Sequence, residues 1–185
     1  IAIAALVLGQ RLGGRVQPNL PTVVAEDKLM LVFRSGEEMY VLDLNGTIIR
    51  TAEDNERASV LAGIDGVAVA GLGASNDVAV LRDETGALHG IGDQIFDPAT
   101  ISNVILFSDG LRALGIKPRE FVSSDVTLPW FTVTSDREFL LLFDAKQNIE
   151  TQLTVLKAVI DERFATQELA PKYIDVRFGN RVYVR

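Results

Sequence analysis

Residues 173–185 read YIDVRFGNRVYVR and decide the fold at this end of the chain. Apolar and polar residues alternate up to Phe178, and they alternate again after the Gly179-Asn180 pair. Such period-two alternation is typical of a β-strand with one buried face, and glycine and asparagine tolerate the positive φ of a tight turn. The stretch therefore predicts a β-hairpin. If nothing covers its second strand, residues 181–185, that strand's backbone donors and acceptors are free to pair with another chain.

The sequence before this hairpin predicts mainly strands and two long helices. Asp97-Pro98 is typical of a helix start, so we expect one long helix over residues 98–114, closed by Gly115. Residues 145–164 predict the second, with Leu153 and Leu156 on its apolar face. Residues 53–61 predict a short helix. The expected strands are residues 29–34, 39–43, 47–50, 66–72, 78–81, 86–91, 121–126, 130–135 and 138–143.

Most of these strands follow one another through short turns such as Asn45-Gly46. Such connections favour antiparallel pairing, so we expect an α+β fold, a mostly antiparallel β-sheet with two long helices packed on it. A doubly wound parallel sheet would require regular alternation of strands and helices, which the sequence lacks.

Composition limits the classes of protein. The chain of 185 residues is 48% hydrophobic, enough for a globular core. Its 18 basic and 25 acidic residues give a formal net charge of −7, which disfavours nucleic acid and the anionic face of a membrane as partners. The chain has no cysteine, so disulfide and thiolate chemistry are excluded.

The first eight residues, IAIAALVL, are entirely apolar. No apolar run reaches the roughly 18 residues that a membrane-spanning helix needs. Two interpretations stay open for this octet, the remainder of a membrane helix that began earlier in a longer protein or a buried helix or strand.

Motifs for catalysis or metal binding are weak. His89 is the only histidine, so a His-rich metal site is excluded, and we expect a surface or turn residue. Residues 71–76 begin like a dinucleotide-binding loop, but Asn76 replaces the third glycine. Residues 43–46 lack the spacing of a calcium loop, and a hairpin turn explains the Asn-Gly-Thr sequence there. We therefore predict no catalytic, cofactor-binding or metal-binding residue.

Two further features have structural interpretations. Asp175 and Arg177 lie two residues apart on one strand face, which favours a structural ion pair over an active-site carboxylate. Trp130 follows Pro129 and is expected as a core or rim aromatic.

The closing stretch resembles the C-terminal signature of the FtsQ/DivIB family of bacterial cell-division proteins. The β domain of that family typically ends with a Tyr-Ile-Asp-Leu-Arg-like strand, a turn and one last strand. The residues that match are Tyr173, Ile174, Asp175, Arg177 and, as an aromatic, Phe178, whereas Val176 replaces the usual leucine. Upstream, Gln152-Leu153 and Leu156 fall in a helix similar to the family's penultimate helix, and residues 40–43 followed by Gly46 resemble the entry into its β domain.

The resemblance divides the chain into two parts. Residues 29–185 correspond to the FtsQ/DivIB-like β domain. Residues 1–28 correspond to a membrane-proximal segment or to a remnant of the POTRA domain that precedes the β domain in the family. A complete POTRA domain does not fit into that length, so roles that the POTRA domain has in the family do not transfer.

The resemblance implies a non-enzymatic scaffold with no cofactor. Family members are single-pass proteins of the cell membrane, with their bulk on the extracytoplasmic side at the division septum. They bind the small division proteins FtsB and FtsL and so support the septal peptidoglycan synthase complex. The family's β domain binds FtsB by strand addition at its last strand.

Carried over to this chain, the resemblance and the edge of the hairpin predict a partner-binding site with Phe178 and Tyr183 as anchors. We expect Tyr183→Pro to abolish binding if the Tyr183 N–H points outward. The competing interpretation is an ordinary sheet strand whose arginines guard the edge. The predicted partner-binding residues are Phe178, Asn180, Arg181, Val182, Tyr183, Val184 and Arg185.

Two other classes remain open. An extracytoplasmic hydrolase would need a deep pocket with two carboxylates roughly 5–10 Å apart. A structural module of a secretion or pilus assembly would have a covered terminal strand and an exposed apolar patch elsewhere.

Overall fold

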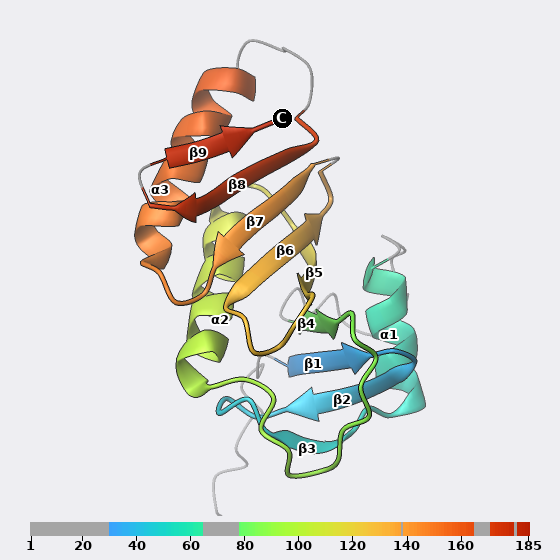
Figure 1. The fold of residues 1–185 in the computed structure, drawn as a ribbon. Helices are drawn as coiled ribbons and strands as arrows, with labels where there is room; N and C mark the ends of the chain where they lie inside the picture. Colours follow the sequence, from blue (N-terminus) through green and yellow to red (C-terminus); the bar gives the residue numbers. More distant parts are fainter. Residues whose placement is uncertain (1–29, 65–77, 138, 165–170, 180) are drawn as a thin grey trace, which may run out of the picture.

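A computed structural model describes residues 30–64, 78–137, 139–164, 171–179 and 181–185. The predicted strand at residues 66–72 and the proposed division at residues 1–28, with its apolar octet, lie outside the described residues. Figure 1 shows one twisted sheet of nine strands in the order β3-β2-β1-β4-β5-β6-β7-β8-β9. The strands are β1 Met30–Ser35, β2 Glu38–Leu42, β3 Ile48–Thr51, β4 Val78–Asp83, β5 Pro118–Ser123, β6 Trp130–Ser135, β7 Leu140–Asp144, β8 Tyr173–Phe178 and β9 Arg181–Val184.

The α+β class is confirmed, but the sheet is mixed. β1–β4, β4–β5 and β7–β8 pair in parallel, and the other neighbours pair antiparallel. Parallel neighbours need a crossover connection, and helices supply it between β4 and β5 and between β7 and β8. The expected strand at residues 86–91 is wrong, because residues 84–97 form a long loop with no strand assigned in it.

The prediction of two long helices is also wrong. The described helices are α1 Asp54–Ile64, α2 Pro98–Ala113 and α3 Ile149–Val159, of 11, 16 and 11 residues. α3 starts later than expected because Asn148 caps it, its side chain accepting a hydrogen bond from the Thr151 backbone N–H. Beyond Val159 the backbone widens into a short π-helix, η1 Ile160–Phe164.

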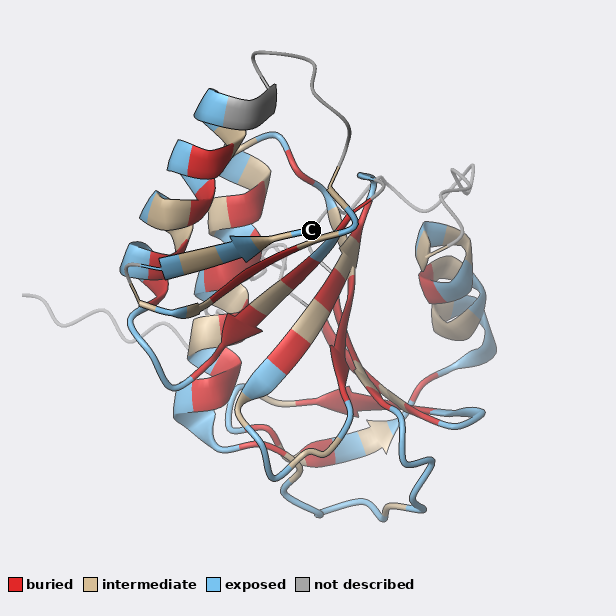
Figure 2. Cartoon of the chain, turned by 45° about the horizontal axis from the view of Figure 1, so that its top comes forward, coloured by how far each residue is buried: buried red, intermediate tan, exposed pale blue. Residues whose placement is uncertain are grey.

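The helices cover the two faces of the sheet unequally. α2 and α3 pack on one face, and α1 lies on the other face beside β1 and β2 (Figures 1 and 2). The side chains of β1 alternate between the two faces of the sheet. Leu31 and Phe33 belong to the large core, whereas Val32 packs with Val60 of α1 on the other face. No described helix covers the α1-side face over β6 to β9.

Close approach and buried polar contacts hold α2 and α3 in the larger layer. The Leu153 side chain occupies the space where a Cβ of Gly110 would lie, so the two helices come together at that glycine. The Gln152 side chain is fully buried and forms 2.9 Å hydrogen bonds with both the N–H and the C=O of Asp144 at the end of β7. The predicted start of α2 is confirmed, because Asp97 accepts from the Thr100 N–H at 2.8 Å.

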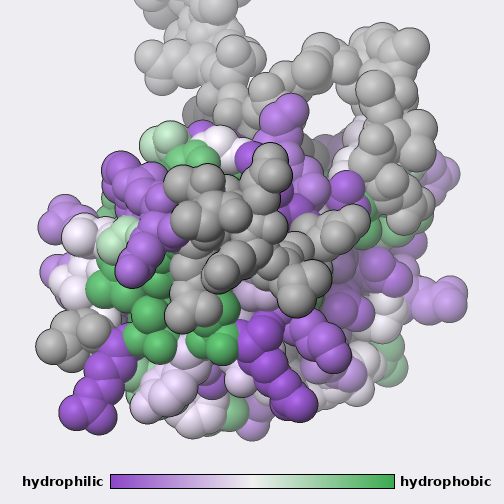
Figure 3. All heavy atoms as spheres, turned by 90° about the horizontal axis from the view of Figure 1, so that it is seen from above, coloured by the Kyte–Doolittle hydropathy of each residue, from purple (hydrophilic) through white to green (hydrophobic). Residues whose placement is uncertain are grey.

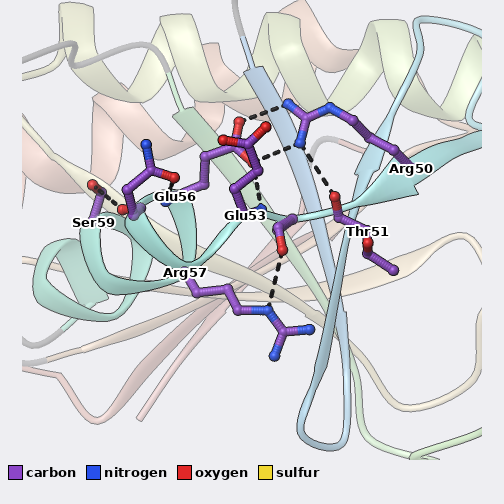
Figure 4. A network of polar contacts seen from close by, with 8 residues as sticks. Arg50, Thr51, Glu53, Glu56, Arg57 and Ser59 are labelled. Carbon is purple, nitrogen blue, oxygen red and sulfur yellow. Dashed lines mark hydrogen bonds and ion pairs between the residues drawn. The ribbon is translucent and has the colours of Figure 1, made fainter.

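α1 is fastened to β3 by charged groups, shown in Figure 4. Both terminal nitrogens of Arg50 donate to the Glu56 carboxylate at 2.6 Å. Glu56 also accepts from the Glu53 backbone N–H, as in a helix capping box. The hydrogen bonds from Arg50 lower the pKa of Glu56 despite partial burial. Arg57 reaches back to the Ala52 carbonyl, so the helix start and the end of β3 form one unit.

The loop of residues 84–97 covers the β3 edge of the sheet. Ile48 donates to the Asp93 carbonyl at 2.9 Å and accepts from the Gly92 N–H at 2.8 Å, and Thr47 forms a bridge with Gln94. The Gly46 carbonyl in the β2–β3 turn accepts from the Ile95 N–H at 2.9 Å. The loop therefore satisfies backbone groups that an edge strand would otherwise expose.

Leu156→Ala tests the packing of α3. Leu156 is fully buried in the large core, so its truncation is expected to lower the free energy of unfolding by about 2–5 kcal/mol. Leu106→Ala on the exposed side of α2 is the matched control and should change it by about 0.5 kcal/mol or less. Equal thermal melts for the two variants would contradict the assignment of the buried face.

Gly46→Ala tests the docking of the loop. Gly46 has φ 80°, and a Cβ there would lie 2.2 Å from the Phe96 carbonyl oxygen. Gly115 has a similar φ of 72° with nothing within 4 Å of its Cβ position, so Gly115→Ala carries the backbone strain alone, roughly 1–2 kcal/mol. We expect Gly46→Ala to lower the free energy of unfolding clearly more, by about 3 kcal/mol or more, as measured by chemical denaturation. Equal losses of stability in Gly46→Ala and Gly115→Ala would show that the loop shifts to accommodate the Cβ at no energetic cost.

Candidate functional site

The closing hairpin is confirmed as β8 and β9, and β9 lies at the end of the sheet (Figure 1). Phe178 pairs with Arg181 across a turn in which Gly179 has φ 64°. Within the described ranges no strand or loop pairs with the outer side of β9. Asn180 lies outside the described residues, so its predicted role is untested.

The register shows which backbone groups of β9 face outward. Tyr173 and Arg185 exchange hydrogen bonds of 3.3 and 3.2 Å, so they form a hydrogen-bonded pair. Such pairs alternate along antiparallel strands, and the next one is Asp175 with Tyr183. The N–H and C=O of Tyr183 therefore face β8, whereas those of Val182 and Val184 face the open edge. Tyr183→Pro was expected to abolish binding if the Tyr183 N–H points outward. That condition is not met, because the Tyr183 N–H points toward β8.

The side chains of β9 alternate as the sequence predicts. Val182 and Val184 are half-buried and pack against the large core beneath α3. Arg181, Tyr183 and Arg185 are exposed on the opposite face.

The two predicted anchor side chains form one aromatic pair. Phe178 and Tyr183 are each 51% exposed, and their rings meet edge to face at a centroid distance of 5.3 Å. They therefore present a large aromatic surface next to the open edge.

A groove runs beside the open edge. It has a volume of about 500 Å³, with Val159 at the end of α3 and Glu162 in η1 on one side and residues of β9 on the other. Figure 3, which looks down on this end of the molecule, shows apolar side chains gathered next to hydrophilic ones. Sequence reasoning missed the contribution of α3 and η1, because Val159 and Glu162 precede the hairpin and no motif connects them to it.

The expected Asp175–Arg177 ion pair is confirmed and organises the exposed face of the hairpin. Arg177 Nη2 and Nε donate to the two carboxylate oxygens of Asp175 at 2.7 and 2.9 Å. These bonds raise the pKa of the Arg177 guanidinium. The guanidinium lies 5.3 Å from the ring centroid of Trp130 and 5.6 Å from that of Phe178. It thus connects β6 with the aromatic pair beside the edge.

Basic charge concentrates in the hairpin. Residues 172–185 carry four basic side chains and one acidic side chain, whereas the whole chain has a net charge of −7. Asp175 is already paired with Arg177, which leaves Lys172, Arg181 and Arg185 as exposed cations in this segment. The open edge therefore favours an acidic partner over a basic one.

His89, expected as a surface or turn residue, lies in the loop of residues 84–97 just before a turn and is half-buried. Its ring is half-buried against Phe33 and Tyr40, with centroid distances of 5.3 and 6.4 Å. The residue anchors the loop, because its backbone carbonyl accepts from the Tyr40 hydroxyl at 3.2 Å. The turn at Asp43 is confirmed, since its carboxylate accepts from the Asn45 and Thr47 N–H groups. The dinucleotide-like residues 71–76 lie outside the described ranges.

The described residues show little catalytic geometry. Among the described residues, one acidic side chain, Glu162, lines the groove beside β9. A second hollow, of about 270 Å³ on the open sheet face, is also lined by one acidic side chain, Glu84. Neither hollow therefore provides the two carboxylates that the hydrolase alternative requires from this part of the chain. No cluster of three or more metal-ligating side chains occurs among the residues described. In the same ranges, no helix combines the length and hydrophobicity needed to cross a bilayer.

Comparison with known proteins adds no identity: neither a protein-family model nor a curated protein sequence matches the chain.

Asp175→Ala tests the ion pair. Asp175 is nearly buried, so its loss leaves Arg177 without a counter-ion and should lower the free energy of unfolding by about 1–3 kcal/mol. Because Arg177 then no longer lies fixed over Trp130, the only tryptophan, the emission of the folded variant should also change. Asp125→Ala, at an exposed turn, is the control. Unchanged emission with unchanged stability would contradict an organising role for the pair.

Proposed function

We propose that this protein is a non-enzymatic scaffold that binds a partner chain by strand addition at β9. The observation that carries the proposal is the difference between the two edges of the sheet. The loop of residues 84–97 hydrogen-bonds to β3, whereas no described residue pairs with the outward N–H and C=O groups of Val182 and Val184. An open edge of this kind is the surface that β-augmentation uses. The open edge also disfavours a structural module of a secretion or pilus assembly, because such a module was expected to have its terminal strand covered.

The groove and the hairpin charge define the partner. A strand added beside β9 would alternate its side chains between the two faces of the sheet. On the α3 side they would meet Val159, Val182 and Val184, which favours apolar residues. On the other side they would lie near Arg181, Tyr183 and Arg185, which favours acidic residues. The fitting partner is an acidic, amphipathic segment.

A second copy of the chain fits less well. If two β9 strands paired antiparallel over residues 181–185, Arg181 of each copy would lie opposite Arg185 of the other. Like charges directly opposite each other destabilise an antiparallel pair. The arginines thus oppose self-association while they attract an acidic strand. They can therefore guard the edge against a second copy and still allow a partner chain to bind.

The resemblance to FtsQ/DivIB proteins supplies the biological setting of the proposal. In that setting the partners are FtsB- and FtsL-like division proteins, and binding supports the septal peptidoglycan synthase complex. The full-length protein is then a single-pass membrane protein with these residues, 29–185, as its extracytoplasmic β domain at the division septum. The match at Tyr173, Ile174, Asp175 and Arg177 supports this setting.

Val184→Pro tests strand addition. Proline removes the N–H that faces the open edge and leaves the Tyr183 pairing with Asp175 in place, so binding of the FtsB-like segment should fall by about tenfold or more. Val184→Ala keeps the N–H and is the matched control, with a smaller loss expected. Affinity is measured by titration calorimetry, and folding by circular dichroism.

Tyr183→Pro completes this experiment. It removes an N–H that faces β8, so it should destabilise the hairpin more than Val184→Pro does, by roughly 1–2 kcal/mol. Binding by folded Val184→Pro at wild-type affinity would refute strand addition at β9. Absence of binding by the wild type would refute the FtsB-like partner.

A further inference from the structure

The end of the sheet opposite β9 exposes large apolar side chains. Leu88 and Ile91, in the loop that covers β3, are 89% and 70% exposed, and Leu44 in the β2–β3 turn is 64% exposed. The Gln94 side chain donates to the Asn45 carbonyl at 3.3 Å, so the loop and the turn lie side by side. Side chains this exposed contribute little to the core of their own molecule, and they are available for contact with another one.

The same end of the molecule is acidic. Glu84, Asp93 and Asp97 are exposed, and neither the loop of residues 84–97 nor the β2–β3 turn contains a lysine or arginine. The nearest cation in the chain, the Arg82 side chain, lies between the carboxylates of Glu84 and Glu120. The exposed apolar side chains therefore lie among negative charges, which favours a contact surface that is both basic and apolar.

The β9 end of the molecule has the complementary composition. Lys172, Arg181 and Arg185 are exposed there, on the same hairpin as the aromatic pair of Phe178 and Tyr183. β3 and β9 are the two edge strands of the nine-stranded sheet (Figure 1). Strand spacings of about 4.8 Å put them roughly 38 Å apart along the sheet, several times the Debye length of about 8 Å. One copy therefore cannot bring its own two ends together, whereas two copies can.

Charge decides how two copies meet. Two hairpin ends would place arginine against arginine, and two loop ends would place carboxylate against carboxylate, so both symmetric contacts are disfavoured. A loop end against a hairpin end pairs opposite charges and brings Leu88 and Ile91 onto aromatic rings. Every copy carries both surfaces, so the basic, aromatic surface that the loop end requires is always present at the concentration of the protein itself.

We propose that copies of this protein associate head to tail, with the loop of residues 84–97 of one copy on the exposed face of the β8–β9 hairpin of the next. The contact is heterologous, so a free loop end and a free hairpin end remain and further copies can add. It uses the side chains of Arg181 and Arg185 and not the outward backbone groups of Val182 and Val184. The proposal therefore does not rest on strand addition at β9.

Analytical ultracentrifugation of the full chain tests the contact. At low ionic strength the sedimentation coefficient of the wild type is expected to rise as its concentration is raised to about 0.5 mM. The rise should disappear in about 0.5 M NaCl, because salt screens the exposed charges.

Two double variants test which ends meet. Glu84→Lys with Ala87→Lys makes the loop end basic and keeps Leu88 and Ile91, and Arg181→Glu with Arg185→Glu makes the hairpin acidic. Each variant alone then has like charges at both ends and should self-associate at least about tenfold more weakly than the wild type. An equimolar mixture of the two variants should associate, because the unchanged loop end of the second then meets the unchanged hairpin of the first.

The matched control is Asp109→Lys with Ala113→Lys, which makes the same change of charge at exposed positions of α2 and should self-associate like the wild type. Val184→Pro should also self-associate like the wild type, so this contact and strand addition can fail separately. Circular dichroism checks that each variant is folded. Absence of association by the wild type at low ionic strength would overturn the proposal. Association of both charge variants at wild-type strength, or no association in their mixture, would also overturn it.

Discussion

An open β-sheet leaves unpaired backbone donors and acceptors at both edges, and this constraint organises the molecule. At one end the loop of residues 84–97 bonds to Ile48, with Gly46 allowing the close approach and His89 anchoring the loop on Phe33 and Tyr40. At the other end β9 keeps the N–H and C=O groups of Val182 and Val184 directed outward. The two edges therefore differ, because the loop bonds to Ile48 of β3 whereas no described residue bonds to the outer side of β9.

The core explains why the open strand is stable without a partner. Val182 and Val184 pack on the large apolar cluster below α3, so β9 is fixed from one face although only β8 supplies it with hydrogen bonds. Asp175 and Arg177 fix the other face by a nearly buried ion pair. A pre-formed edge pays little conformational entropy when a strand is added, which favours affinity.

The sheet face on the α1 side changes in composition from one part of the sheet to the other. α1 covers the part of this face formed by β1, β2 and β4, since its Val60 packs in one cluster with Val32, Met39, Val41, Ala52 and Val80. Beyond them the face changes to threonine, arginine and tryptophan, which stay half-exposed. Arg177 belongs to both regions, because it stacks on Trp130 at the hollow and on Phe178 at the edge.

The sequence by itself determined the local structures. Period-two alternation predicted the closing hairpin, Asn45-Gly46 predicted a turn, and Asp97 predicted a helix start, because neighbouring residues alone set these. Tertiary structure decided what depends on distant segments. Parallel pairing follows from crossover helices. The strand expected at residues 86–91 is part of a loop, and the following residues, 92–95, bond to Ile48 and Gly46. The outward direction of Val184 depends on the pairing register with β8, and the hollow assembles side chains from β4 to β8. No local pattern encodes these arrangements, since they arise only when strands far apart in the chain become neighbours.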